Sequence, residues 1–119
     1  MIHGIGLDIV EIERIATLLK RQPKIARRVL TASELKQFNV LGEKRKIEFL
    51  AGRFAVKEAY AKAIGCGIGR ELSFQDIEIV KEASGRPYIR HPKYHVHVSI
   101  THTKEYAAAQ VVVEKKAGV

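Results

Sequence analysis

The segment 43–64 constrains the fold of this chain more than any other stretch, because it predicts a single long helix. Apolar residues recur along it at helical spacing and should face a core: Ile47, Leu50, Phe54, Ala61 and Ile64. Gly65 follows, and glycine is the residue best suited to the left-handed turn that ends a helix. Many remaining positions are alanine or glycine, so another backbone or a ligand can come close to this helix.

Glu58 and Lys62 lie one turn apart on this predicted helix. A carboxylate and an ammonium group held side by side, just before the glycine-rich segment 65–69, can serve a metal ion and a phosphate together. The alternative is an ordinary ion pair on a helix surface, which contributes about 0.2–0.5 kcal/mol. The segment 65–69 also allows two interpretations, a flexible connector or a loop that lies against a phosphate or a pantetheine-like chain.

Residues 2–10 alternate as a strand with two different sides. The first side holds Ile5, Leu7 and Ile9, and the second holds Gly4, Gly6, Asp8 and Val10. Because Asp8 shares its side with two glycines, there is room for something to approach the backbone there. An aspartate in so apolar a strand costs free energy unless it is paired or bound to a cation. The alternative is that Asp8 caps a helix beginning near Ile9.

A run of basic residues with no acidic one extends from residue 14 to residue 28, over two predicted helices, 11–20 and 24–30. The run consists of Arg14, Lys20, Arg21, Lys24, Arg27 and Arg28. The whole chain has a formal net charge of +8, from 21 Lys and Arg against 13 Asp and Glu. Such a surface favours nucleic acid, an anionic membrane, a phosphate-rich small molecule or an acidic protein. A solvated charged face without a partner is the alternative.

The remaining segments predict a short helix and then strands. Thr31 and Glu34 form a capping box that opens a helix reaching about Asn39. Predicted strands cover 74–80, 86–91, 95–101 and 107–114, with a hairpin turn at 82–85. His95 and His97 have no cysteine or carboxylate near them in the sequence, which disfavours zinc. His102 stands at the end of a strand among hydroxyl groups, as a phosphate ligand or an ordinary turn histidine.

The length of 119 residues predicts one domain, which is small enough to gain stability from oligomerisation. No apolar run approaches the roughly 20 residues of a membrane span. The first residues lack the basic start and cleavage site of a signal peptide. Cys66 is the one cysteine, so no disulfide forms within the chain and a reducing cytoplasm fits best.

Three segments together carry a family pattern: 4–14, 52–62 and 99–103. The first sets Asp8 in a glycine-flanked opening strand. The second contains Phe54, Lys57, Glu58, Ala59 and Lys62, and the third leads from Ser99 to His102. In this order the segments resemble the holo-acyl-carrier-protein synthases, the small bacterial 4'-phosphopantetheinyl transferases. The resemblance implies a single α+β domain over residues 1–119, with an antiparallel sheet packed around the long helix. It also implies a homotrimer with active sites between subunits.

The same resemblance implies a reaction, its ligands and its residues. The enzyme would move 4'-phosphopantetheine from coenzyme A to a serine of apo-acyl carrier protein, releasing adenosine 3',5'-bisphosphate. Asp8 and Glu58 would hold Mg2+, a hard cation that prefers carboxylate oxygens, and Lys62 would offset charge on the transferred phosphoryl group. The residues expected to bind coenzyme A are Arg53, Lys62, Gly65, Gly85, Pro87, His102 and Thr103. The acidic carrier would dock on Arg14, Arg21, Lys24 and Arg28.

Two other functions fit parts of the sequence. A compact basic domain that binds RNA is one, although the aromatic residues needed to stack bases are few, with four Phe, four Tyr and no Trp. A metal-dependent phosphodiesterase that uses Asp8 and Glu58 is the other. The family resemblance favours the transferase and implies neither a nucleic-acid nor a membrane partner. For the serine proton it leaves two acceptors open, a metal-bound water or a carboxylate.

Overall fold

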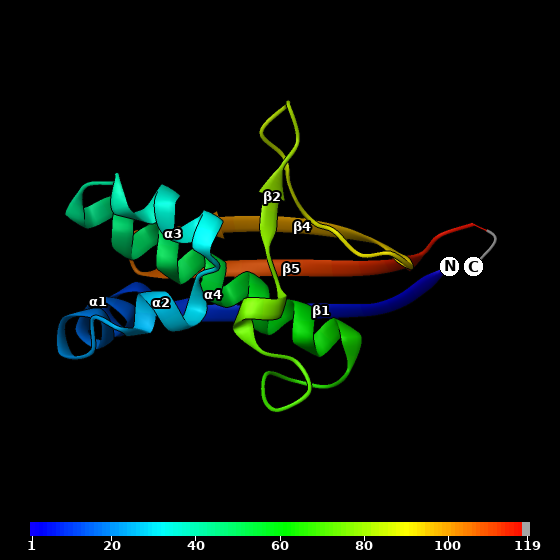
Figure 1. Cartoon of the computed structure of the whole chain (residues 1–119), viewed down its shortest axis with the longest axis horizontal. Coiled ribbons are helices and arrows are strands. Elements are labelled where there is room, and N and C mark those ends of the chain that lie inside the picture. The colour runs from blue at the N-terminus through cyan, green and yellow to red at the C-terminus, as the bar shows by residue number, and fades with distance from the viewer. Residues whose placement is uncertain (118–119) are drawn as a thin grey trace.

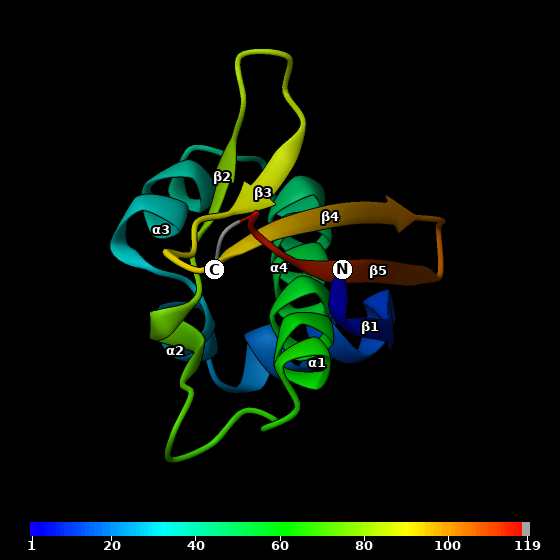
Figure 2. The same cartoon turned by 90° about the vertical axis from the view of Figure 1, so that its right-hand side faces the viewer.

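In the computed structural model, which describes residues 1–117, five strands form one antiparallel sheet (Figure 1). The elements are β1 (Ile2–Glu11), α1 (Ile12–Arg21), α2 (Ile25–Val29), α3 (Ala32–Asn39), α4 (Glu43–Ile64), η1 (Phe74–Asp76), β2 (Ile79–Lys81), β3 (Pro87–Ile89), β4 (Tyr94–His102) and β5 (Tyr106–Lys115). The spatial order is β1-β5-β4-β3-β2, so the first strand lies at an edge beside the last. Helix α4 packs on β1, β5 and β4, and the β2–β3 hairpin projects from the molecule (Figure 2). The predicted α+β architecture is confirmed.

Helix α4 has the predicted bounds and brings its small residues against the sheet. It ends at Gly65, whose φ of +94° is the left-handed conformation that glycine adopts readily. On β1, a Cβ added at Gly6 would lie 1.7 Å from the carbonyl oxygen of Ala59, and one at Gly4 would lie 1.9 Å from that of Ala63. The backbone of α4 therefore occupies the room that the glycines of β1 leave.

The other side of β1 is apolar and open to solvent. Ile5, Leu7 and Ile9 are 61%, 63% and 65% exposed in the isolated chain. The strand continues to Glu11 and α1 begins at Ile12. The alternative in which Asp8 caps a helix is thus wrong, because residues 2–11 keep an extended ladder with β5.

A buried ion pair that the sequence analysis did not anticipate joins α3 to α4. The capping box of Thr31 and Glu34 is confirmed, but Glu34 is wholly buried and has two further donors. Its Oε1 atom lies 2.6 Å from Nζ of Lys57, and its Oε2 atom accepts from the backbone N–H of Ile79 at 2.8 Å. Through Glu34 the helices α3 and α4 are therefore tied to the first residue of β2.

The predicted strand over 74–80 is wrong in its first half. Residues 74–76 form the 3₁₀ turn η1, in which Asp76 accepts from the backbone N–H of Ser73 at 2.9 Å. Strand β2 is left with three residues, and β3 is shorter than the predicted 86–91. The hairpin between them is confirmed, with Gly85 at a φ of +90°. None of the helices described within residues 1–117 is long and apolar enough to cross a bilayer.

Candidate active site

Asp8, Glu58 and Lys62 meet at the free edge of the sheet, where β1 runs beside α4. Nζ of Lys62 lies 3.2 Å from Oδ1 of Asp8 and donates to the backbone carbonyl of Leu7 at 3.0 Å. Within residues 1–117, Lys62 is at ion-pair distance from Asp8 but not from Glu58. The interpretation of Glu58 and Lys62 as a simple helix-surface pair is therefore wrong, since the lysine reaches across to the strand.

The charge of Asp8 acts on Glu58. Partial burial raises the pKa of the Glu58 carboxyl above its ordinary value, and the nearby negative charge of Asp8 raises it further, while Lys62 opposes both. A carboxylate whose charge is disfavoured by a second carboxylate nearby marks a place where a cation is favoured. No group of three His, Cys, Asp or Glu side chains suited to a metal occurs among the described residues. Two oxygen donors alone fit Mg2+, which takes one or two carboxylates plus phosphate oxygens and water.

His102 and Thr103 lie where β4 ends, beside the first turns of α1 and α4. The Oγ1 atom of Thr103 accepts from the backbone N–H groups of Glu105 and Tyr106, and Nε2 of His102 lies 3.7 Å from Oε2 of Glu48. Both residues line a hollow together with Lys44 and Lys104. These two lysines were not predicted as site residues, and only the proximity of Lys104 to His102 in the sequence could have suggested one of them.

Arg53 is buried in the molecule. Its guanidinium carbon is 4.3 Å from the centre of the Phe49 ring, and burial lowers its pKa. Its Nε atom is buried, with no hydrogen-bond partner among residues 1–117. Within that part of the chain, Arg53 makes no hydrogen bond or ion pair with the acids of the edge site. The phosphate contact that the resemblance implies for Arg53 therefore stays a prediction.

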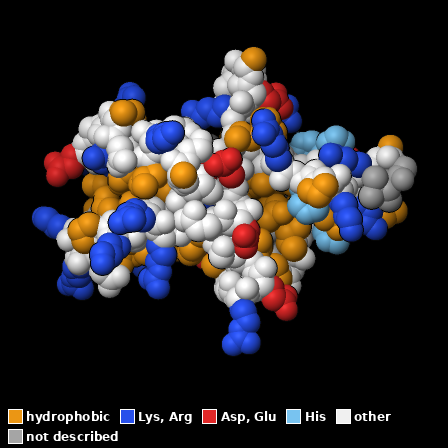
Figure 3. Space-filling model, viewed as in Figure 1, with side chains coloured by type: hydrophobic (Ala, Val, Ile, Leu, Met, Phe, Trp, Pro, Cys, Tyr) orange, Lys and Arg blue, Asp and Glu red, His pale blue; other side chains and the backbone are white. Residues whose placement is uncertain are grey.

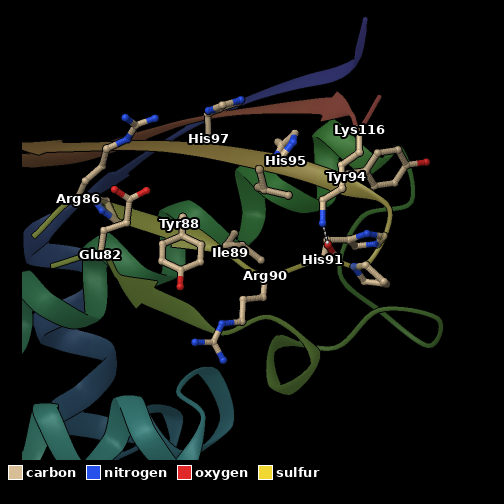
Figure 4. Close-up of a pocket in the computed structure, with 13 residues that line it drawn as sticks. Glu82, Arg86, Tyr88, Ile89, Arg90, His91, Tyr94, His95, His97 and Lys116 are labelled. Carbon is tan, nitrogen blue, oxygen red and sulfur yellow. Dashed lines mark hydrogen bonds between the residues drawn. The ribbon is translucent and has the colours of Figure 1, made fainter. Parts of the chain in front are cut away.

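Gly85 and Pro87 belong to the β2–β3 hairpin, whereas Gly65 forms the turn that ends α4. Pro87 lines a cavity of about 550 Å³ between the hairpin, β4 and the segment 90–92. Figure 4 shows basic side chains around it, with Arg86 at the left, Arg90 below and Lys116 at the right. Asp8, Glu58 and Lys62 do not line this cavity. Its basic and aromatic lining suits an anionic ligand with an aromatic ring.

The basic residues predicted to dock a carrier form one surface. Arg14 and Arg21 line a hollow on α1, and Arg21, Lys24 and Arg28 line the next hollow together with Arg27. Because Arg21 borders both hollows, the four predicted residues are contiguous. We call this the basic surface: Arg14, Arg21, Lys24, Arg27 and Arg28. Figure 3 shows Lys and Arg side chains gathered over the end of the molecule formed by α1 and α2.

Comparisons with known proteins agree on one family. Residues 4–111 match the model of the 4'-phosphopantetheinyl transferase superfamily. The holo-[acyl-carrier-protein] synthase of Bacillus subtilis is 65% identical over 118 residues, which are 97% of this chain and 98% of the relative. A crystal structure of a Bacillus anthracis holo-(acyl-carrier-protein) synthase with CoA (3',5'-ADP) superposes with a TM-score of 0.91 at 48% identity, covering 98% and 99% of the two chains. The Helicobacter pylori enzyme with coenzyme A gives 0.81 at 39% identity, covering 92% and 99%.

Proposed function

Because this chain belongs to the 4'-phosphopantetheinyl transferase superfamily and has the activity of a holo-[acyl-carrier-protein] synthase, we propose that Asp8, Glu58 and Lys62 carry out the transfer. The reaction moves phosphopantetheine from coenzyme A to an acyl carrier protein, and the proposed acceptor is a serine hydroxyl. Adenosine 3',5'-bisphosphate is then the leaving product. The observation that supports the assignment is the meeting of Asp8, Glu58 and Lys62 across β1 and α4.

Asp8 and Glu58 are the proposed ligands of Mg2+. Their carboxylates are close enough for one charge to act on the other, and an oxygen donor set suits a hard dication. When bound, the cation supplies neutralisation of the pyrophosphate oxygens. Lys62, held at the site by Asp8 and by the carbonyl of Leu7, places an ammonium group where negative charge develops on the transferred phosphoryl group.

Coenzyme A is proposed to contact two regions of the surface. The hollow of His102 and Thr103 with Lys44 and Lys104 offers cationic groups to phosphates. The hairpin of Gly85 and Pro87 borders the basic and aromatic cavity of Figure 4, which suits the adenine end of the ligand. Gly65 and Arg53 complete the proposed set. Their assignment rests on the family resemblance.

A homotrimer with active sites shared between subunits accounts for the open side of the sheet. Ile5, Leu7 and Ile9 form an apolar row that a soluble monomer would leave in water. A neighbouring subunit that covers this row could also bring its own hairpin cavity to the edge site of the first subunit. We treat residues 1–119 as one domain, since β1 and β5 belong to a single sheet. The free, exposed thiol of Cys66 favours the cytoplasm.

The basic surface is the proposed docking site of the carrier protein. Acyl carrier proteins are acidic, and Arg14, Arg21, Lys24 and Arg28 line two adjoining hollows, of which the one at Arg14 also contains Glu11 and Glu13. Complementary charge speeds encounter and fixes register between partners.

The deciding experiment is incubation of the protein with coenzyme A, Mg2+ and apo-acyl carrier protein, followed by intact mass measurement of the carrier. The expected result is one added phosphopantetheine, absent when the acceptor serine of the carrier is replaced by alanine. Cleavage of coenzyme A with an unmodified carrier would instead support the phosphodiesterase. Salt-sensitive RNA binding without turnover of coenzyme A would support the RNA-binding alternative.

A further inference from the structure

The C-terminal end of α2 is held by two side chains from distant parts of the sequence. The last carbonyl groups of a helix have no partner within it, and α2 has only five residues. Nε2 of Gln75 donates to the carbonyl oxygens of Arg27 at 2.8 Å, Arg28 at 3.2 Å and Leu30 at 2.8 Å. Nζ of Lys57 donates to the carbonyl oxygen of Val29 at 2.7 Å. Gln75 and Lys57 thus supply donors to four consecutive carbonyl groups.

The two donor side chains differ in burial. Lys57 is wholly buried and paired with Glu34, so its loss would disturb the whole fold. Gln75 is exposed on η1, which lies side by side with α2 (Figures 1 and 2). A substitution at Gln75 therefore loosens the end of α2 while Lys57 and the buried side chain of Val29 keep the helix on the core. A helix this short has too few internal hydrogen bonds to keep its place unaided.

Helix α2, to which Gln75 donates, carries part of the basic surface. Arg27 and Arg28 lie on α2, Lys24 is its N-cap residue, and all three line one hollow with Arg21. Attraction between opposite charges falls with distance, so the fit of an acidic partner depends on where α2 stands relative to α1.

We propose that Gln75 is a positioning residue for carrier recognition: it fixes α2, and with it Lys24, Arg27 and Arg28, where an acidic carrier protein meets them. The inference rests on the proposed docking of the carrier at the basic surface. Gln75 acts through the backbone of α2 and contacts neither coenzyme A nor the acids of the edge site. Its loss therefore raises the KM for the carrier and leaves the KM for coenzyme A and kcat at saturating carrier unchanged.

Three variants at one position test the contact. Gln75→Ala removes the donor, Gln75→Glu turns a carboxylate toward three carbonyl oxygens, and Gln75→Lys restores a donor at the negative end of the helix. The carrier KM should rise about fivefold for the alanine variant, the fold-change of roughly one lost hydrogen bond. It should rise further for glutamate and return close to the parent value for lysine. Gln37→Ala is the matched control, because Gln37 is exposed on α3 and has no side-chain hydrogen bond within residues 1–117.

Hydrogen exchange of the α2 amides, measured in the protein without carrier, separates positioning from direct contact. Faster exchange at residues 28–30 in Gln75→Ala and Gln75→Glu supports positioning. A raised carrier KM with unchanged exchange would mean that Gln75 touches the carrier itself, and this overturns the proposal. An unchanged carrier KM in Gln75→Glu also overturns it, provided that Arg28→Glu raises that KM. If Arg28→Glu has no effect, the docking proposal fails and the inference fails with it.

Discussion

Nζ of Lys57 lies 2.6 Å from Oε1 of Glu34, and both side chains are completely shielded from solvent. The same lysine donates to the carbonyl groups of Val29 and Phe74. Helix α4 is thereby tied to α2, α3 and η1 at a single residue, and the next residue along the helix is Glu58. We expect the buried pair to constrain the rotation of α4 about its axis and so to help keep Glu58 near enough to Asp8 for the charge of Asp8 to raise its pKa.

Lys57→Met should lower the free energy of unfolding by about 3–5 kcal/mol, because it leaves the Glu34 charge buried without its cation. Urea denaturation measures the loss. The double variant Lys57→Met with Glu34→Gln should recover part of it, since no unpaired charge remains. Lys36→Met, at an exposed position of α3, should stay within about 0.5 kcal/mol of the parent. A single Lys57→Met variant as stable as the parent would contradict this account.

Glu58→Gln should abolish transfer and yet raise the Tm of the metal-free protein at pH 7. Burial and Asp8 raise the pKa of Glu58 from 4.5, so the folded chain holds this proton more tightly than the unfolded chain. The stability linked to that proton is complete below pH 4.5 and is lost as pH rises through the raised pKa. The variant's advantage should therefore vanish at about pH 4.

Thermal melts between pH 4 and pH 8 in the presence of a chelator measure this difference. Glu71→Gln, at an exposed acid outside the edge site, is the control. If the Tm of Glu58→Gln exceeds that of the parent by more as the pH falls, the pH dependence is opposite to the expected one and the explanation is rejected.

Gly6→Ala should destabilise the protein by about 3 kcal/mol or more, because its Cβ would overlap the carbonyl oxygen of Ala59. The overlap pushes α4 away from β1 and separates Glu58 from Asp8, so activity should fall by more than the folded fraction does. Gly42→Ala is the control, since nothing lies within 4 Å of the added Cβ. Chemical denaturation measures the stability of both variants, and transfer rates normalised to the folded fraction measure their activity. Equal effects of the two substitutions would show that the close approach is unimportant.

Arg14→Glu should raise the carrier KM about tenfold and weaken its dependence on salt, because it reverses a charge of the basic surface. Coenzyme A affinity, measured by calorimetry, should remain at the parent value. Lys36→Glu changes the net charge equally at an exposed position outside the basic surface, and it should leave the carrier KM almost unaltered. If both affinities fell together, the docking assignment would be wrong.

Leu7→Lys should convert the expected trimer into smaller species, because it sets a charge in the apolar row of β1. Light scattering after size-exclusion chromatography reports the mass. Val40→Lys replaces an apolar residue outside the sheet that is more exposed than Leu7, and it should leave the mass unchanged. A Leu7→Lys protein with the parent's mass would place the subunit interface elsewhere.

Local chemistry made much of this structure predictable. Gly65 ends α4 because a left-handed φ suits glycine, and Thr31 opens α3 because its hydroxyl accepts from the backbone N–H of Glu34. The alternation over 2–10 indicated a strand that places Asp8 beside two glycines. These signals depend on neighbours within a few residues, which any sequence displays directly.

Residues whose environment comes from distant segments were not predictable. Lys57 belongs to the family pattern, but its neighbours in the sequence do not indicate that it is buried, because its partner Glu34 lies 23 positions away. The segment 74–76 is a turn rather than a strand, with the carbonyl of Phe74 bonded to Lys57 and the side chain of Gln75 bonded to α2. Ile5, Leu7 and Ile9 are exposed because the other side of β1 packs on α4. The alternation in the sequence shows that the strand has two different sides, but it does not show which of them faces the helix.

The pairing of β1 with β5 joins residues 2–11 to residues 106–115. A ribosome makes the first of these segments before the second. The strand that bears Asp8 therefore cannot close its hydrogen-bond ladder until β5 has left the ribosome. A nascent chain interrupted after β4 would carry every acid of the edge site without the ladder that positions Asp8, and we expect it to be inactive.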